Sequence, residues 1–169
     1  MTVNSDWTIA YARMAEADFH TWSVLQALSG VPECHKLLFL QMACEKLTKA
    51  HLCDLGTDPD TLQTSHAFTA KTLPVVIRQQ LSSVGNKIKN RRWDSACSKH
   101  LAEEIAVLAP AVKRDGQRPD NCEYPWRDDL EKIHVPLDWK FVPSRLLMEP
   151  AGRTFLKLVQ SAIAELLSD

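Results

Sequence analysis

The stretch Gln41-Met42-Ala43-Cys44-Glu45-Lys46-Leu47-Thr48-Lys49-Ala50 lies at the centre of a segment that predicts a helix from Glu33 or Cys34 to about Leu55. Apolar side chains recur along this segment in steps of three and four, the spacing of one helix face. The main face holds Leu37, Leu40, Cys44, Leu47 and Leu55, and a mixed strip opposite holds Leu38, Met42, Glu45, Lys49 and Leu52. A helix with two apolar sides is expected at the centre of a bundle or in an oligomer interface. Glu45 and Lys49 also stand in the i,i+4 order that favours an ion pair.

The preceding segment predicts a helix from about Asp6, its expected N-cap, to Leu28, ended by a Gly-Pro turn. Its predicted apolar face holds Trp7, Ala10, Tyr11, Met14, Trp22, Leu25 and Leu28. Asp18 falls within that face. Because an unpaired carboxylate there would be costly, we expect Asp18 to have a partner or to lie in a groove.

Three further helices are predicted along the rest of the chain. One runs from His66 to about Asn90, with a break at Leu73-Pro74, and another from Arg91 to Leu108. The last begins at Pro150, a favourable first helical residue. The only strand signal lies at residues 73–77. We therefore expect an all-α protein, a four- to five-helix bundle, whose 169 residues form a single domain.

Residues 110–149 form a long proline-rich segment before the C-terminal helix. Because helices tolerate proline only in their first turn, no long helix is expected here. The segment also carries aromatic side chains, which disordered chains rarely contain. These are Tyr124, Trp126, Trp139 and Phe141. We expect the segment to be ordered and to wrap the bundle.

The composition narrows the class of protein. An apolar fraction of 45% excludes a disordered chain, and a net charge of −1 means that nucleic-acid binding would need a local basic patch. Charged residues interrupt the start of the chain, unlike a secretory signal, and uninterrupted apolar runs such as residues 37–40 are far too short to span a bilayer. The five cysteines contain no C-x-x-C pair, which favours free thiols over a zinc site. A cytoplasmic protein without a metal, a cofactor or a membrane contact is expected.

Three motifs in order along the chain form a recognisable pattern. They are Ala17-Asp18-Phe19, the Gln41–Ala50 stretch, and Ser65-His66-Ala67-Phe68. The pattern resembles the HEPN superfamily, small helical-bundle domains with an Asp on the first helix, Q-x-A-x-E-K-x-x-K-A on the second, and a His opening the next. The resemblance covers roughly residues 10–75. Residues 121–141 are also similar to a Glu-Tyr-Pro-Trp segment of some small HEPN-like proteins.

The resemblance implies a prokaryotic cytosolic bundle that is frequently a dimer. Relatives are metal-independent ribonucleases of toxin–antitoxin and anti-phage defence systems, non-catalytic partners of nucleotidyltransferases, or nucleotide-binding modules. Our first hypothesis is an RNA- or nucleotide-associated binding module, acting as a homodimer or in a hetero-complex with a nucleotidyltransferase or another defence protein. The second is a ribonuclease. The third is a non-catalytic helical scaffold or adaptor without a nucleotide ligand.

Ribonuclease chemistry would fall to Arg127, Asp128 and His134. Catalytic HEPN members carry an Arg and a His with four to six residues between them, often with a polar residue directly after the Arg. Here six residues separate Arg127 from His134, and Asp128 is the polar follower. In metal-free RNA cleavage His can relay protons near neutral pH, and Arg can hold the charge that develops on the phosphate. The acidic neighbours would repel an RNA backbone, so a surface turn is the alternative.

Two groups of residues are candidates for binding. The first is expected to converge on one groove, either as a ligand pocket or as a structural ion-pair network. Its members are Asp18, Glu45, Lys49 and His66. The second is a basic run beside an aromatic residue, which suits phosphates and a stacked base or, alternatively, a solvated helix end. It consists of Lys87, Lys89, Arg91 and Arg92, with Trp93 beside them. His51 is expected to be a core histidine with a satisfied ring.

Overall fold

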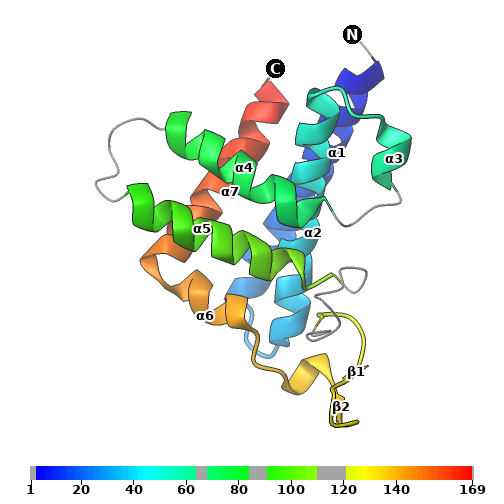
Figure 1. Cartoon of the computed structure of the whole chain (residues 1–169), viewed down its shortest axis with the longest axis vertical. Helices are drawn as coiled ribbons and strands as arrows, with labels where there is room; N and C mark the ends of the chain where they lie inside the picture. The colour runs from blue at the N-terminus through cyan, green and yellow to red at the C-terminus, as the bar shows by residue number, and fades with distance from the viewer. Residues whose placement is uncertain (1–2, 64–67, 84–90, 110–120, 169) are drawn as a thin grey trace.

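A computed structural model describes residues 3–63, 68–83, 91–109 and 121–168, with side chains from residue 5 onward and excluding those of 91–98. The all-α class is confirmed, since the described residues are mostly helical (Figure 1). The elements are α1 (Val3–Ala27), α2 (Glu33–Asp54), α3 (Pro59–Gln63), α4 (Thr69–Ser83), α5 (Arg91–Ala106), β1 (Trp126–Arg127), β2 (Ile133–His134), the 3-10 helix η1 (Pro136–Asp138), α6 (Val142–Met148) and α7 (Pro150–Ser168).

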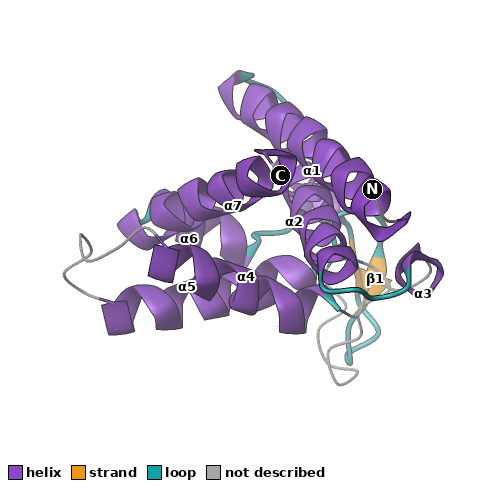
Figure 2. Cartoon of the chain, turned by 90° about the horizontal axis from the view of Figure 1, so that it is seen from above, coloured by secondary structure: helices purple, strands orange, loops and turns teal. Residues whose placement is uncertain are grey.

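The second long helix, α2, lies between α1 on one side and α4 and α5 on the other (Figure 2). Side chains on both of its sides are buried, among them Leu37, Gln41 and Lys49. The prediction of a central helix is therefore confirmed. The helix ends before Leu55, and Gly56 follows with a φ of +90°, a conformation that glycine adopts without a steric penalty.

The first helix packs along α2 through small side chains, and its predicted apolar face is only partly correct, since Trp22 lies in the core. Ala12 and Ala15 are fully buried, which lets the two helix backbones approach closely, while Met14 is 51% exposed. The helix begins at Val3, so Asp6 lies in its first turn rather than at its N-cap. The spacing of apolar residues correctly predicts a helix here. However, α1 has two apolar stripes, and the one that contains Ala12 and Ala15 faces α2.

Helix α4 passes through Pro74 without a break, contrary to the prediction. It is continuous over Thr69–Ser83, and Leu73, Val76 and Ile77 are buried on its core side. The stretch with a strand signal is therefore helical. Pro74 has no N–H to donate, so one helical hydrogen bond is missing, while burial of the apolar side chains on both sides of the proline stabilises the helix.

The last two helices meet at a close crossing. The predicted start of α7 at Pro150 is confirmed, and Phe155, Val159 and Ala162 of its predicted stripe are buried. A Cβ atom added at Gly152 would lie 2.2 Å from the carbonyl oxygen of Leu146 in α6, so only glycine fits there. The short helices α3 and α6 exceed the five that we expected, and α6 lies within the proline-rich segment.

Residues 121–141 gather at the end of the bundle opposite both chain termini (Figure 1). Asn121 organises their start, since its Oδ1 accepts the backbone N–H groups of Glu123 at 2.9 Å and Tyr124 at 2.7 Å. Strands β1 and β2 then pair antiparallel. This part of the proline-rich segment is thus ordered as predicted, but it forms a hairpin at one end rather than a wrap around the bundle.

Candidate functional site

The turn between β1 and β2 is built on Asp128. Its Oδ1 accepts the backbone N–H groups of Leu130 at 2.9 Å and Lys132 at 3.0 Å. Glu131 has a φ of +60°, the left-handed conformation that a tight turn requires. Asp128 therefore captures N–H groups locally and favours a turn, as short polar side chains commonly do.

The hairpin brings Asp128 and His134 together. Nε2 of His134 lies 2.8 Å from Oδ2 of Asp128. The imidazole stacks on Trp126, with ring centroids 5.8 Å apart, and meets the edge of Trp139 at 5.0 Å. The two indoles and the carboxylate thus fix the orientation of the ring. A pocket of about 370 Å³ lies beside it, lined by Lys132, Ile133, His134, Val135, Asp138 and Trp139.

Hydrogen bonding lowers the pKa of Asp128 below its ordinary value. The largest cause is the hydrogen bond with His134, followed by the hydrogen bond from the backbone of Lys132. Both favour the ionised carboxylate. A carboxylate in this position can orient a histidine for proton transfer, or it can serve only to hold the two strands of the hairpin together.

Arg127 lies apart from this pair. Successive side chains of a strand point to opposite faces, so Arg127 and its cross-strand neighbour Ile133 lie on the face away from Trp126 and His134. Its Nη1 is 2.5 Å from Oε2 of Glu131, an exposed ion pair. Residues 121–141 also carry five carboxylates against three Lys or Arg residues. This arrangement is unfavourable for holding an RNA phosphate between an Arg and a His.

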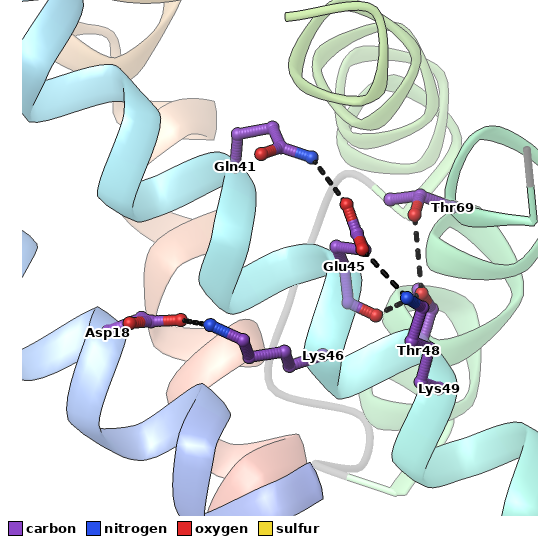
Figure 3. A network of polar contacts seen from close by, with 7 residues as sticks. All are labelled: Asp18, Gln41, Glu45, Lys46, Thr48, Lys49 and Thr69. Carbon is purple, nitrogen blue, oxygen red and sulfur yellow. Dashed lines mark hydrogen bonds and ion pairs between the residues drawn. The ribbon is translucent and has the colours of Figure 1, made fainter. Parts of the chain in front are cut away.

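The polar side chains of α2 form two separate groups (Figure 3). Toward α1, Lys46 pairs with Asp18. Toward α4, Nζ of Lys49 lies 2.9 Å from Oε1 of Glu45, so the predicted i,i+4 pair is confirmed. Asp18 does not join Glu45 and Lys49 as expected, because one step along a helix turns the side chain by about 100°. His66, the fourth expected member, lies outside the described residues.

The Glu45 group is held on several sides within the core. Nε2 of Gln41 donates to Oε2 of Glu45 at 3.0 Å. The Thr48 hydroxyl donates to the Glu45 carbonyl at 2.7 Å and lies 3.5 Å from the hydroxyl of Thr69 on α4. These contacts join protein groups to one another, which is the arrangement of a structural ion-pair network.

His51 is half-buried at the edge of the bundle rather than in its core. It lines a pocket of about 260 Å³ together with Asp54, Gln80 and Glu165. Burial lowers its pKa, while the charges of Asp54 and Glu165 act in the opposite direction. Arg91, Arg92 and Trp93 of the predicted basic run fall in the first turn of α5, and their side chains lie outside the described part. Lys87 and Lys89 of the same run also lie outside the described residues.

The sequence reasoning missed several partners that complete these groups. Lys46 pairs with Asp18, and Trp126 and Trp139 flank His134. The sequence signal for the two indoles was their place in an aromatic-rich segment. That signal predicted that the segment packs on the helices, but it did not predict that His134 lies between the two rings. For Lys46, the sequence held no comparable signal.

No protein-family model, curated protein or solved structure matches this chain. Across the described ranges, no helix combines the length and the apolar character needed to cross a membrane. The same residues contain no group of three or more His, Cys, Asp or Glu side chains placed to hold a metal ion.

Proposed function

We propose that this chain is a non-catalytic, HEPN-like binding module of the prokaryotic cytoplasm, and that residues 121–141 contact a protein partner. The observation that carries the proposal is the exposure of apolar side chains on the β1–β2 hairpin and on η1, which follows it directly. Leu130 is 88% exposed, Ile133 64% and Leu137 63%. Exposed apolar side chains that gather on one ordered element are typical of a protein-interaction surface.

The base of the hairpin supports this role because it is fixed before any partner binds. Trp126 is buried, the centroids of Trp126 and Trp139 lie 5.2 Å apart at nearly right angles, and His134 touches both rings. A surface that is already ordered loses less conformational entropy on association. The acidic rim around the apolar tip favours a partner with basic residues around an apolar contact.

We expect the partner to be a nucleotidyltransferase or another component of a toxin–antitoxin or anti-phage defence system, as the family resemblance implies. We also propose that the chain forms a homodimer, and the outer side of α1 supports this. It presents apolar and small residues to solvent in alternating steps of three and four, the spacing of a helix–helix seam. The stripe consists of Trp7, Ala10, Met14, Ala17, Thr21, Val24 and Leu28.

The test is calorimetry between the purified chain and the protein encoded by an adjacent gene. Leu130→Asp and Ile133→Asp should each weaken binding by at least about tenfold, since each removes an apolar contact and adds charge. Leu55→Asp is the matched control, because Leu55 is exposed at the end of α2. Equal affinity for all variants would refute the proposed surface.

Ribonuclease activity is the second candidate, and the Asp128–His134 hydrogen bond is the observation that favours it. Incubation of the purified chain with RNA separates the two readings. We expect no cleavage by the wild type. Cleavage by the wild type that is lost in His134→Ala would overturn the non-catalytic proposal and assign His134 a catalytic role.

A further inference from the structure

A pocket of about 420 Å³ lies between the C-terminal half of α1, the start of α2, and the α6–α7 corner, on elements separate from the hairpin. Its size is in the range of sites that hold small ligands, roughly 300–1,000 Å³. The lining includes Leu147, Met148 and Leu156 as apolar side chains. The close crossing at Gly152 fixes α6 against α7 and so sets this wall of the pocket.

Two polar atoms at this pocket are buried without a partner. Nε1 of Trp22 and Oγ of Ser144 have no hydrogen bond, and they are the only such side-chain atoms found in the described part of the protein. Both residues line the same pocket, although they come from different helices, α1 and α6. The Trp22 side chain as a whole is nearly inaccessible, with 9% of the residue exposed.

An unpaired buried donor destabilises a protein, so such atoms rarely occur without a reason. The Trp22 indole can only donate, and the Ser144 hydroxyl can donate or accept. A ligand that satisfies both must therefore bring an acceptor to Trp22, and a carboxylate can accept from both residues.

The pocket rim carries one charge of each sign. Arg153 is exposed there and uses Nη1 to donate to the Met148 carbonyl at 2.6 Å, which leaves its other N–H groups for a ligand. Glu33 is exposed on the α2 side. A simple carboxylate would meet repulsion from Glu33, and a simple amine would meet repulsion from Arg153. A molecule with both charges is favoured by both residues.

We propose that this pocket binds a free α-amino acid with an apolar side chain. Its carboxylate accepts from Trp22, Ser144 and Arg153, its ammonium group faces Glu33, and its side chain packs on the apolar wall. Because Trp22 Nε1 and Ser144 Oγ do not contact solvent, binding requires a small adjustment of the floor. Rotation of the Ser144 side chain and the flexible Met148, which is 77% exposed, allow it. This inference is independent of the proposed function of the hairpin.

The experiment is an NMR titration of the full chain, ¹⁵N-labelled at its tryptophan indoles, with L-leucine. The Trp22 resonance is assigned by its disappearance in Trp22→Phe. We expect a saturable downfield shift of that resonance, as a new hydrogen bond forms at the indole N–H. Isocaproate lacks the ammonium group and leucinamide lacks the carboxylate, so each should bind at least about tenfold more weakly.

Variants of the lining residues test the assigned roles. Ser144→Ala should weaken leucine binding about tenfold without destabilising the protein, since it removes a hydroxyl that has no partner. Glu33→Gln should weaken binding of leucine but not of isocaproate, and the exposed Ser161→Ala on α7 is the control. An unchanged Trp22 resonance at saturating leucine, or equal affinity for isocaproate, overturns the proposal.

Discussion

At the scale of single residues, the Asp128 carboxylate has three hydrogen-bond partners at once: His134 and the backbone N–H groups of Leu130 and Lys132. These contacts lower its pKa in the folded protein. A carboxyl group whose pKa is lowered by folding stabilises the folded form above the pKa that it has when unfolded. That contribution is lost as the pH falls through the lowered, folded-state pKa.

We expect acidification to loosen the hairpin at a pH below the ordinary carboxyl range. The indole resonances of Trp126 and Trp139, followed by NMR from neutral to acidic pH, should change as Asp128 takes up its proton. Asp128→Asn should abolish this transition, because an amide does not titrate. Asp129→Asn, an exposed neighbour, should retain it, and a transition that persists in Asp128→Asn would contradict the assignment.

The buried pair of Glu45 and Lys49 makes a second prediction at this scale. Glu45→Gln leaves the Lys49 ammonium buried without its carboxylate, so the free energy of unfolding should fall by about 3–5 kcal/mol. Adding Lys49→Met should recover much of that loss. Urea denaturation measures both. Glu103→Gln, which removes an exposed i,i+4 partner of Lys99, is the control and should cost less than about 1 kcal/mol.

At the scale of elements, the outer stripe of α1 runs from Trp7 to Val24, about 26 Å of helix at 1.5 Å per residue, and Leu28 follows just beyond the end of the helix. The stripe is nearly symmetric about Ala17, with Met14 and Thr21 at matching positions on either side. The Thr21 hydroxyl donates to the Ala17 carbonyl at 2.9 Å and so is already satisfied. Two antiparallel copies of α1 can therefore pack the same stripe against itself about a twofold axis.

We expect the purified chain to be a dimer in light scattering, and Ala17→Asp to convert it to a monomer, since the substitution places two like charges face to face at the centre of the stripe. Ser23→Asp adds the same charge to an exposed position of α1 outside the stripe and should leave the dimer intact. A monomeric wild type, or a dimeric Ala17→Asp variant, would contradict this prediction.

Pro74 makes the second prediction for an element. An interior proline costs a helix up to about 3 kcal/mol relative to alanine. Pro74→Ala restores an N–H donor within α4, so the midpoint of thermal unfolding should rise. Val75→Ala, at the exposed position next to it, is the control and should change the midpoint little. A lower midpoint for Pro74→Ala would show that the ring packing outweighs the missing hydrogen bond.

The sequence predicted the long helices well because their apolar periods, and the Gly and Pro residues that end them, are local signals. It failed where the outcome depends on neighbours. The α1 stripe with larger apolar residues appeared to be the core face, yet close packing on α2 selected Ala12 and Ala15. The break expected at Pro74 is absent because tertiary contacts stabilise the helix. The prediction of a joint Arg127–His134 site relied on their separation along the chain. In the hairpin, successive side chains of a strand point to opposite faces, so these two side chains lie on different faces.

At the scale of the whole molecule, the bundle buries Cys34, Cys44, Cys53 and Cys122. Burial is the largest cause that raises the pKa values of Cys34, Cys44 and Cys53, so their reactive thiolate forms are scarce. Cys44, which is fully buried on the central helix, reports most directly on opening of the core.

We expect labelling of Cys44 by a thiol reagent, measured by peptide mass spectrometry, to follow global unfolding. Its rate should rise with urea in parallel with the loss of helical circular dichroism, because α2 is covered on both sides. Glu45→Gln should accelerate labelling in proportion to its loss of stability, and Glu103→Gln should not. Rapid labelling of Cys44 in native buffer would instead show that α2 opens locally.

Gly152, at the crossing of α6 and α7, limits which substitutions evolution can accept at this position. Any protein that inherits this corner must keep a residue without a Cβ atom at that position, since even a methyl group would collide with the Leu146 carbonyl. The architecture therefore has a recognisable sequence pattern. A short helix that begins with Val-Pro is followed directly by a helix that begins with proline and has glycine two residues later. Distant relatives can be recognised by it even where few other amino acids are shared.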